Sequence, residues 1–383
     1  MRGLHRLEGH EETRAALARA ADAGALPGSL LVHGPAGVGK QRLALWLAQR
    51  LVCLNPGADP CDACRPCVMA LRLEHPDIHW FFPLPRPKRG GGPEKLAEAL
   101  EDARMAELEE RRNAPLRPAA VGEAAGYFVA HMAVLRRLAA ARPAMGQRKI
   151  FILGDAEALV PQEASQEAAN ALLKLLEEPP ADTTIILTAT DPDALLPTLR
   201  SRVLPVRLRP LPEARVAELL VRSAGAEPAA AGAAARLGGG TIGQALAFLP
   251  QGDEPGPLEA LRLQARELLE AALDPDGSLR LSVAHAQAPA GARGAFRDML
   301  GFLSLWIRDL AATAAGAEEQ VMNVDAAPWL EATARRMPAV VGGVPAALEA
   351  VEKVADLTRV NINPQLALAW LLREVRSALA PVP

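Results

Sequence analysis

Hydrophobic residues in the first 210 positions form two kinds of pattern, short continuous runs and faces with helical spacing. The continuous runs are rich in β-branched residues and predict three buried strands, at 29–34, within 148–159, and at 183–191. Apolar residues spaced near 3.6 predict helices over 7–26, 40–52 and 161–180. Pro161 lies near the start of the last helix, and Pro179-Pro180 ends it. Strands separated by helices predict an α/β domain whose parallel, doubly wound sheet binds ligands at the carboxyl ends of its strands.

Beyond Arg207 the continuous runs stop and only helical spacing remains. Residues 207–250 predict a small helical unit, QGDEPGP at 251–257 a linker, and 258–383 long amphipathic helices with Leu, Ala and Trp stripes. Stripes of this kind favour a helical core and subunit contacts over a cofactor site. The predicted order is therefore an α/β domain over 1–206 followed by two all-α parts.

Residues 83–118 interrupt the α/β pattern. Their Pro/Gly/Arg-rich start predicts a linker, and their Glu/Arg/Ala-rich middle predicts a polar helix with little to bury. The basic RPKRGGG segment could contact nucleic acid, but a solvated insertion fits the composition better.

The segment HGPAGVGK joins the first predicted strand to the helix at 40–52. A strand, a GxxxxGK loop and a helix in this order predict a phosphate-binding loop. The backbone around Gly34, Gly37 and Gly39 and the ammonium of Lys40 could hold the phosphates of ATP or ADP. Gln41 stands where such loops place the Ser or Thr hydroxyl that ligates magnesium, and its longer amide is a poorer ligand for that small cation.

All four cysteines of the chain, Cys53, Cys61, Cys64 and Cys67, lie within 15 positions. Without an apolar secretion signal, this clustering favours a metal site over disulfides, because the cytosol keeps thiols reduced. The spacing C-x7-C-x2-C-x2-C suits one tetrahedral Zn²⁺, and four sulfur ligands leave no open position, so the site is predicted to be structural. The alternative is a loop of reduced, unliganded thiols.

Charge and length narrow the function classes. The chain has 383 residues, a net charge of −3 and only 3% aromatic residues, which argues against a strongly basic nucleic-acid-coating protein. No apolar run reaches the ~18 residues that a membrane span needs, and the first residues carry no apolar signal core. We therefore expect a cytoplasmic protein.

Several of these motifs occur together in one family. HGPAGVGK, the CxxCxxC insertion after the loop helix, ANALLKLLEEPP, TATDPDALLPTLRSR and a helical C-terminal part resemble the bacterial replicative clamp loader, an AAA+ assembly within the DNA polymerase III holoenzyme. Among its subunits the delta-prime family is the most similar. The resemblance rests on motifs up to about residue 250 and on helical character beyond. It implies a P-loop domain over 1–206 with a zinc module at 53–67, a helical lid over 207–250, and a share of a pentameric collar over 258–383.

The resemblance also shows which catalytic parts are missing. Active relatives carry Asp-Glu after the second strand, where this chain has Asp155-Ala156, and Glu157 is expected to point elsewhere. Gly243 stands where the lid arginine of a Gly-Ser-x-Arg motif is expected, and Thr190 lies at a sensor position. With Gln41, three parts of one mechanism are absent, so we expect the isolated chain not to hydrolyse ATP efficiently. Asp155 remains a candidate nucleotide-site residue.

One catalytic part is retained. LRSRV at 199–203 matches the family's Ser-Arg-Cys motif and keeps its arginine, Arg202. The resemblance implies an arginine finger that acts in trans on the γ-phosphate of a neighbouring subunit. The alternative is a strand-end arginine paired with a carboxylate.

The sequence therefore predicts a non-motor clamp loader subunit. By resemblance its partners are the gamma/tau and delta subunits, the sliding clamp, and primer-template DNA held by the assembled hetero-oligomer. One rival is an ATP-hydrolysing gamma/tau-type motor subunit. The other is a zinc-containing nucleic-acid-binding protein with a vestigial loop, which would bind DNA tightly in a salt-dependent way.

Overall fold

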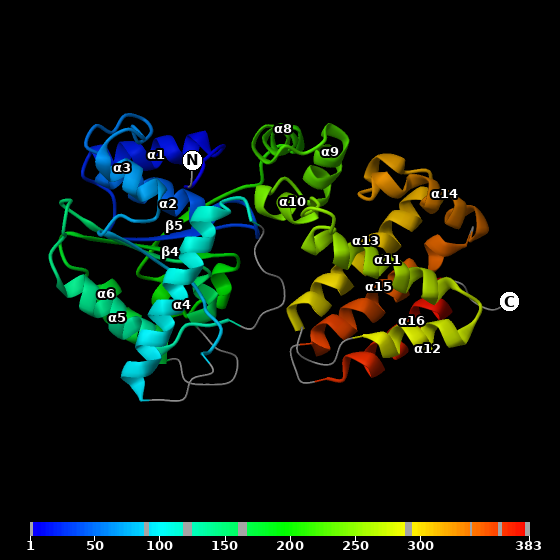
Figure 1. Cartoon of the computed structure of the whole chain (residues 1–383). Helices are drawn as coiled ribbons and strands as arrows, with labels where there is room; N and C mark the ends of the chain where they lie inside the picture. Colours follow the sequence, from blue (N-terminus) through cyan, green and yellow to red (C-terminus); the bar gives the residue numbers. More distant parts are fainter. Residues whose placement is uncertain are drawn as a thin grey trace. The chain divides into compact units, whose positions relative to one another are not determined.

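The computed structural model describes residues 3–87, 92–117, 125–159, 167–287, 293–337, 339–358 and 362–379. Contacts group them into two compact units (Figure 1). The first comprises described residues up to 215 together with 240–243, and the second comprises 216–239 and described residues from 244 on. The predicted lid at 207–250 is thus shared between the units, and its role as a separate domain stays a prediction.

A five-stranded parallel sheet forms the centre of the first unit, with strand order β2-β3-β4-β1-β5. The strands are β1 (Ser29–His33), β2 (Ile78–Phe81), β3 (Lys149–Leu153), β4 (Thr183–Ala189) and β5 (Leu204–Arg207). The three strands expected from apolar runs are β1, β3 and β4, so the parallel α/β prediction is confirmed. The two strands absent from the prediction are the sheet edges. Each has only four residues, and β5 is largely exposed and contains a proline, so neither carries a long apolar run.

Alternate residues of the strands face two helical layers. Leu30 and Val32 of β1 belong to one hydrophobic cluster, and Leu31 belongs to the other. The first cluster is covered by helices α1 (Glu11–Asp22), α2 (Lys40–Val52) and α4 (Pro93–Asn113). The second is covered by α5 (Val129–Ala140), α6 (Glu167–Glu177) and the short α7 (Pro197–Arg200). The loop helix α2 has its predicted bounds, whereas the start predicted for α6 at Pro161 lies outside the described residues.

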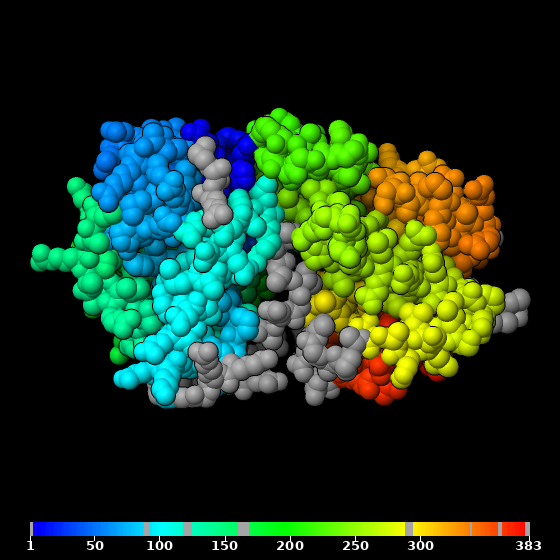
Figure 2. Space-filling model, viewed as in Figure 1, coloured from blue at the N-terminus to red at the C-terminus, as the bar shows by residue number. Residues whose placement is uncertain are grey.

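Helix α4 corrects the prediction of a polar helix with little to bury. It forms within the 83–118 insertion, but Leu100 and Leu108 are 1% and 7% exposed and pack in the same cluster as Trp80 and Phe82. One face of α4 thus belongs to the core, and the other is solvated (Figure 2). The sequence concealed this because two leucines are few among many Glu and Arg residues.

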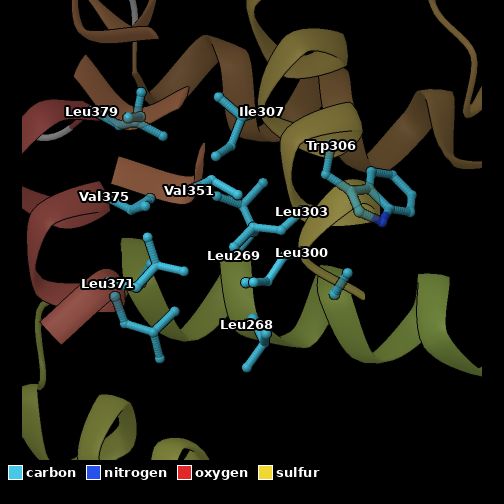
Figure 3. Packing of buried hydrophobic residues seen from close by; sticks show 14 of the residues in the cluster. Leu268, Leu269, Leu300, Leu303, Trp306, Ile307, Val351, Leu371, Val375 and Leu379 are labelled. Carbon is cyan, nitrogen blue, oxygen red and sulfur yellow. The ribbon is translucent and has the colours of Figure 1, made fainter. Parts of the chain in front are cut away.

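The second unit is helical. Its helices are α8 (Glu213–Ala224), which begins in the first unit, α9 (Pro228–Leu237), α10 (Ile242–Phe248), α11 (Pro257–Leu273), α12 (Gly277–Ala286), α13 (Arg293–Ala314), α14 (Ala327–Arg336), α15 (Val340–Leu357) and α16 (Pro364–Leu379). Leu303, Trp306, Val351 and Leu371 from three of them meet in one core (Figure 3). The Leu and Trp stripes are therefore core residues of the chain itself. Among described helices, none has the length and apolar character to cross a bilayer.

Candidate functional site

The phosphate-binding loop lies at the carboxyl end of β1, where parallel sheets place ligands. Gly34, Gly37 and Gly39 have φ of 151°, 75° and 102°, a region that side chains rarely adopt. A Cβ on Gly34 would lie 2.5 Å from the carbonyl oxygen of Leu208, so the backbone also needs glycine for space. The predicted loop therefore exists as a wound backbone cradle that leads into α2.

Lys40 is buried inside this cradle. Its Nζ donates to the carbonyl oxygens of Gly34 and Pro35, both at 2.9 Å, and to Oγ1 of Thr190 at 3.1 Å. Burial lowers the pKa of Lys40, against the raising effect of nearby carboxylates. Since an ammonium has three protons, all its donors are engaged by the protein. A phosphate would have to take the place of these partners.

Gln41 turns its amide toward the acidic residue after β3. Nε2 of Gln41 donates to Oδ2 of Asp155 at 2.9 Å. The amide is packed against Gly154, where a Cβ would lie 2.8 Å from it. Burial raises the pKa of Asp155, although Lys40, Arg111 and the Gln41 bond lower it. The amide of Gln41 is thus committed to Asp155 at the position where phosphate-binding loops place a magnesium-ligating hydroxyl.

The chain reverses immediately after β3. Asp155 has a left-handed φ of 48°, and a 3₁₀ turn spans Ala156–Leu159. Ala156 is fully buried in an apolar cluster, so this position offers no carboxylate to the site. Glu157 does not point elsewhere as expected. Its Oε1 accepts the backbone N–H of Thr190 at 2.9 Å. Burial raises the pKa of Glu157, and the positive charge of Lys40 acts in the opposite direction.

Gly243 makes a backbone contact with the phosphate loop. Its N–H donates to the carbonyl oxygen of Gly37 at 2.9 Å. A Cβ on Gly243 would lie 2.8 Å from Cα of Gly37. The position expected to carry a lid arginine is therefore one where two backbones meet and where a side chain has no room.

Arg111 is a cation beside the loop that the sequence did not indicate. It comes from α4, and its Nη1 lies 3.5 Å from Oε1 of Gln41. Its guanidinium carbon lies 4.0 Å and 4.4 Å from the ring centroids of Phe82 and Trp80, and Nε donates to Glu107 at 2.7 Å. In the sequence, this contact could have been suggested only by the aromatic run WFFPL, which precedes a helix rich in arginine and offers rings for a guanidinium to lie against.

The four cysteines converge as predicted. Their Sγ atoms all lie within 4.8 Å of one another, and those of Cys61 and Cys67 are 4.0 Å apart. A tetrahedron with Zn–S bonds of about 2.3 Å has sulfur atoms about 3.8 Å apart, so the four thiols fit Zn²⁺ after a small contraction. Backbone N–H groups of Cys64 and Ala63 lower the pKa of Cys61 to about 6, while burial raises the pKa of Cys53 and Cys67.

This cysteine cluster is tied to the loop helix. Cys53 ends α2, and Cys67 lies in α3 (Arg65–Leu71). Side chains of α2 hold the intervening loop, since Trp46 Nε1 donates to Asp59 at 2.9 Å and Gln49 Nε2 to Asp62 at 2.8 Å. The loop with the cysteines is thus bonded to the helix that begins at Lys40.

Arg202 lies in the turn between α7 and β5. Its side chain is 33% exposed, with Nη2 2.5 Å from Oε1 of Glu177 and Nη1 2.7 Å from the carbonyl oxygen of Thr198. In the isolated chain it is therefore a strand-end arginine paired with a carboxylate. Such surface pairs contribute about 0–1 kcal/mol, so Arg202 is readily available to another acceptor.

Comparison with known proteins identifies the family. Residues 9–212 match the family model described as DNA polymerase III, delta subunit. The chain is 31% identical to DNA polymerase III subunit delta' of Escherichia coli, over 92% of this chain and 90% of that protein. It is 34% identical to the Pseudomonas aeruginosa delta' subunit, over 52% of this chain and 49% of that protein. Similarity to the Mycobacterium tuberculosis gamma/tau subunit is 31% identity over 56% of this chain and 30% of that protein. The chain therefore belongs to the delta' family of DNA polymerase III subunits.

Proposed function

We propose that this chain is a non-motor subunit of the bacterial replicative clamp loader, the assembly that places the sliding clamp on primed DNA. Its proposed partners are the gamma/tau and delta subunits, the clamp, and primer-template DNA within the complex. Residues from 258 on would contribute to a pentameric collar. Membership of the delta' family supports this proposal.

The non-motor role is carried by the Gln41–Asp155 hydrogen bond. It joins two positions that a magnesium-dependent ATPase would use to hold the metal ion, and does so with an N–H donor. Ala156 adds no water-activating carboxylate, and Gly243 leaves no room for a lid arginine. We therefore propose that the isolated chain is deficient in ATP hydrolysis while its loop keeps a phosphate cradle.

Arg202 is the proposed contribution to catalysis in a neighbouring subunit. It is exposed at the end of the sheet and bound only by surface contacts, so it can exchange Glu177 for a phosphate oxygen without disturbing the core. A guanidinium suits this task because it is always charged and can donate two hydrogen bonds at once.

The test is the DNA-stimulated ATPase of the complex reconstituted with gamma/tau and delta. We expect Arg202→Ala to assemble normally and to lower turnover at the adjacent motor site by roughly 10³-fold, as for other fingers supplied in trans. Arg200→Ala is the matched control, since Arg200 is equally an exposed arginine with a carboxylate partner. Unchanged turnover in Arg202→Ala would remove the finger, and ATP hydrolysis by the isolated chain at motor rates would refute the non-motor role.

We further propose that Cys53, Cys61, Cys64 and Cys67 bind one structural Zn²⁺. The mutual distances of the sulfur atoms and the lowered pKa of Cys61 support a thiolate site. With four protein ligands, the ion would have no position for water. It would fix the loop between α2 and α3.

A further inference from the structure

Helix α6 ends at Glu177, within the segment ALLKLLEEPP, to which the proposed function gives no task. Oε1 of Glu177 accepts a hydrogen bond from Nη2 of Arg202 at 2.5 Å. Among the described residues, Arg202 is the only cation within ion-pair distance of this carboxylate. The arginine proposed to act on a neighbouring subunit is therefore held by a carboxylate of its own chain.

Buried neighbours place the two partners beside each other. Leu176 directly precedes the glutamate and Val203 directly follows the arginine, and both belong to the same hydrophobic cluster. Leu199 of α7 lies in that cluster too and is fully buried. Because the cluster anchors the backbone on both sides, the ion pair follows from the packing of α6 against the turn between α7 and β5.

The ion pair changes what Arg202 offers to an incoming phosphate. The carboxylate of Glu177 offsets the positive charge of the guanidinium and repels a phosphate that approaches the same group. Nη1 is held at the same time by the carbonyl oxygen of Thr198 at 2.7 Å, so both terminal nitrogens have an acceptor within the chain. A γ-phosphate therefore gains the full charge of Arg202 only after it displaces Glu177.

The two acceptors, carboxylate and phosphate, are close enough in strength to compete. The side chains of Glu177 and Arg202 are 47% and 33% exposed, and exposed ion pairs of this kind are weak. Attraction between charges falls with distance, so a phosphate that is closely seated displaces the carboxylate, whereas one held farther away does not. The state of Arg202 then depends on how closely the neighbouring subunit is seated.

We propose that Glu177 is a latch, a carboxylate that holds Arg202 in a resting position and so lowers ATP hydrolysis in the neighbouring motor subunit until that subunit is closely seated. In this proposal, DNA bound by the assembled complex brings the two subunits into the close arrangement. The inference rests on the proposed function, because it takes Arg202 as the finger. It gives the end of the segment ALLKLLEEPP a regulatory role.

The test is the ATPase of the complex reconstituted with gamma/tau and delta, measured without DNA and with saturating primer-template DNA. We expect Glu177→Gln, which keeps the shape and removes the charge, to raise turnover without DNA by about 2- to 5-fold, the range that an exposed ion pair supplies. Turnover with DNA should stay at the wild-type value, because the finger is already engaged there. Glu178→Gln is the matched control, since Glu178 is the next carboxylate along the chain, is exposed, and has no ion-pair partner among the described residues.

Three results would overturn the latch. They are turnover of Glu177→Gln without DNA that does not exceed wild type, an equal gain with saturating DNA, and a gain that persists when Arg202→Ala is added. Thermal melting of Glu177→Gln, compared with Glu178→Gln, shows whether the fold is intact.

The failure of the latch and the failure of the finger give different results. If Arg202→Ala alone leaves turnover unchanged, the finger and the latch are both refuted. If Arg202→Ala lowers turnover and Glu177→Gln does not raise it, only the latch is refuted, and the proposed function is unaffected.

Discussion

Gly243 offers the sharpest test of the close approach between α10 and the phosphate loop. Adding a single methyl group there places Cβ 2.8 Å from Cα and 3.1 Å from the carbonyl oxygen of Gly37. Both are backbone atoms of the phosphate loop, so no flexible side chain can move aside. Contacts become ordinary at 3.4 Å, which means the two backbones must separate by about 3.4 − 2.8 = 0.6 Å.

The expected cost follows from that displacement. Overpacking of this kind costs about 1–3 kcal/mol, and the 2.9 Å bond from Gly243 N–H to Gly37 is strained with it. Alanine regains up to about 1 kcal/mol of helix propensity near the start of α10. Gly243→Ala should therefore destabilise the first unit by about 1–2 kcal/mol, or lower its melting temperature by roughly 2–8 °C. An arginine has the same Cβ, so Gly243→Arg should not restore an active lid.

Urea unfolding, with calorimetry for the melting temperature, measures this change. Gly232→Ala is the matched control, because Gly232 lies in α9 and a Cβ added there would have no atom within 4 Å, so alanine should stabilise by about 0.5–1 kcal/mol. The two substitutions are chemically identical and opposite in expected sign. If Gly243→Ala is as stable as wild type, the loop moves away from the new methyl group at no cost. The close approach then contributes nothing to the free energy of unfolding.

Two further predictions concern the first unit. Burial opposes ionisation of Asp77, but three backbone N–H bonds from residues 144–146 lower its pKa. The ionised carboxylate therefore stabilises the fold above the pKa of an unfolded aspartate, and this stabilisation is lost as pH falls through the lower folded pKa. Asp77→Asn should flatten the acid limb of a plot of unfolding free energy against pH, and an unaltered limb would contradict this. Chelation should release one Zn²⁺ per chain, and Cys64→Ser should weaken zinc binding, while circular dichroism shows that the sheet is intact. Elemental analysis that finds no metal in the native protein would refute the zinc site.

Features encoded by neighbouring residues could be predicted from the sequence. The loop helix has the bounds expected from its periodicity, and the cysteine spacing predicted a cluster that the structure brings together. The glycines of the loop were equally readable, because GxxxxGK between a strand and a helix fixes local backbone geometry. In each case the information lies within about 15 residues.

Contacts between distant segments were not predictable. Arg111 and Gln41 are 70 residues apart, and nothing in a Glu/Arg-rich helix shows which arginine faces inward. Glu157 was misjudged because strand geometry was extended past β3, whereas Asp155 at φ 48° begins a 3₁₀ turn that brings Glu157 back to Thr190. Gly243 was interpreted as a missing arginine. Only the structure shows that the glycine permits its backbone to approach and hydrogen-bond Gly37 of the phosphate loop.

The three positions at which we expected catalytic groups make other contacts in this chain, and these contacts bear on why the loop keeps its shape. If Gln41 were smaller and apolar, the carboxylate of Asp155 would lie in a partly buried site without its amide partner, which is costly. Ala156 completes an apolar cluster, and Gly243 lets its backbone bond the loop. At each of the three positions the residue that is present makes a contact within the first unit. These contacts hold the cradle in place at the carboxyl end of β1, and a fixed backbone is what a subunit needs if it presents Arg202 at a set position to a neighbour.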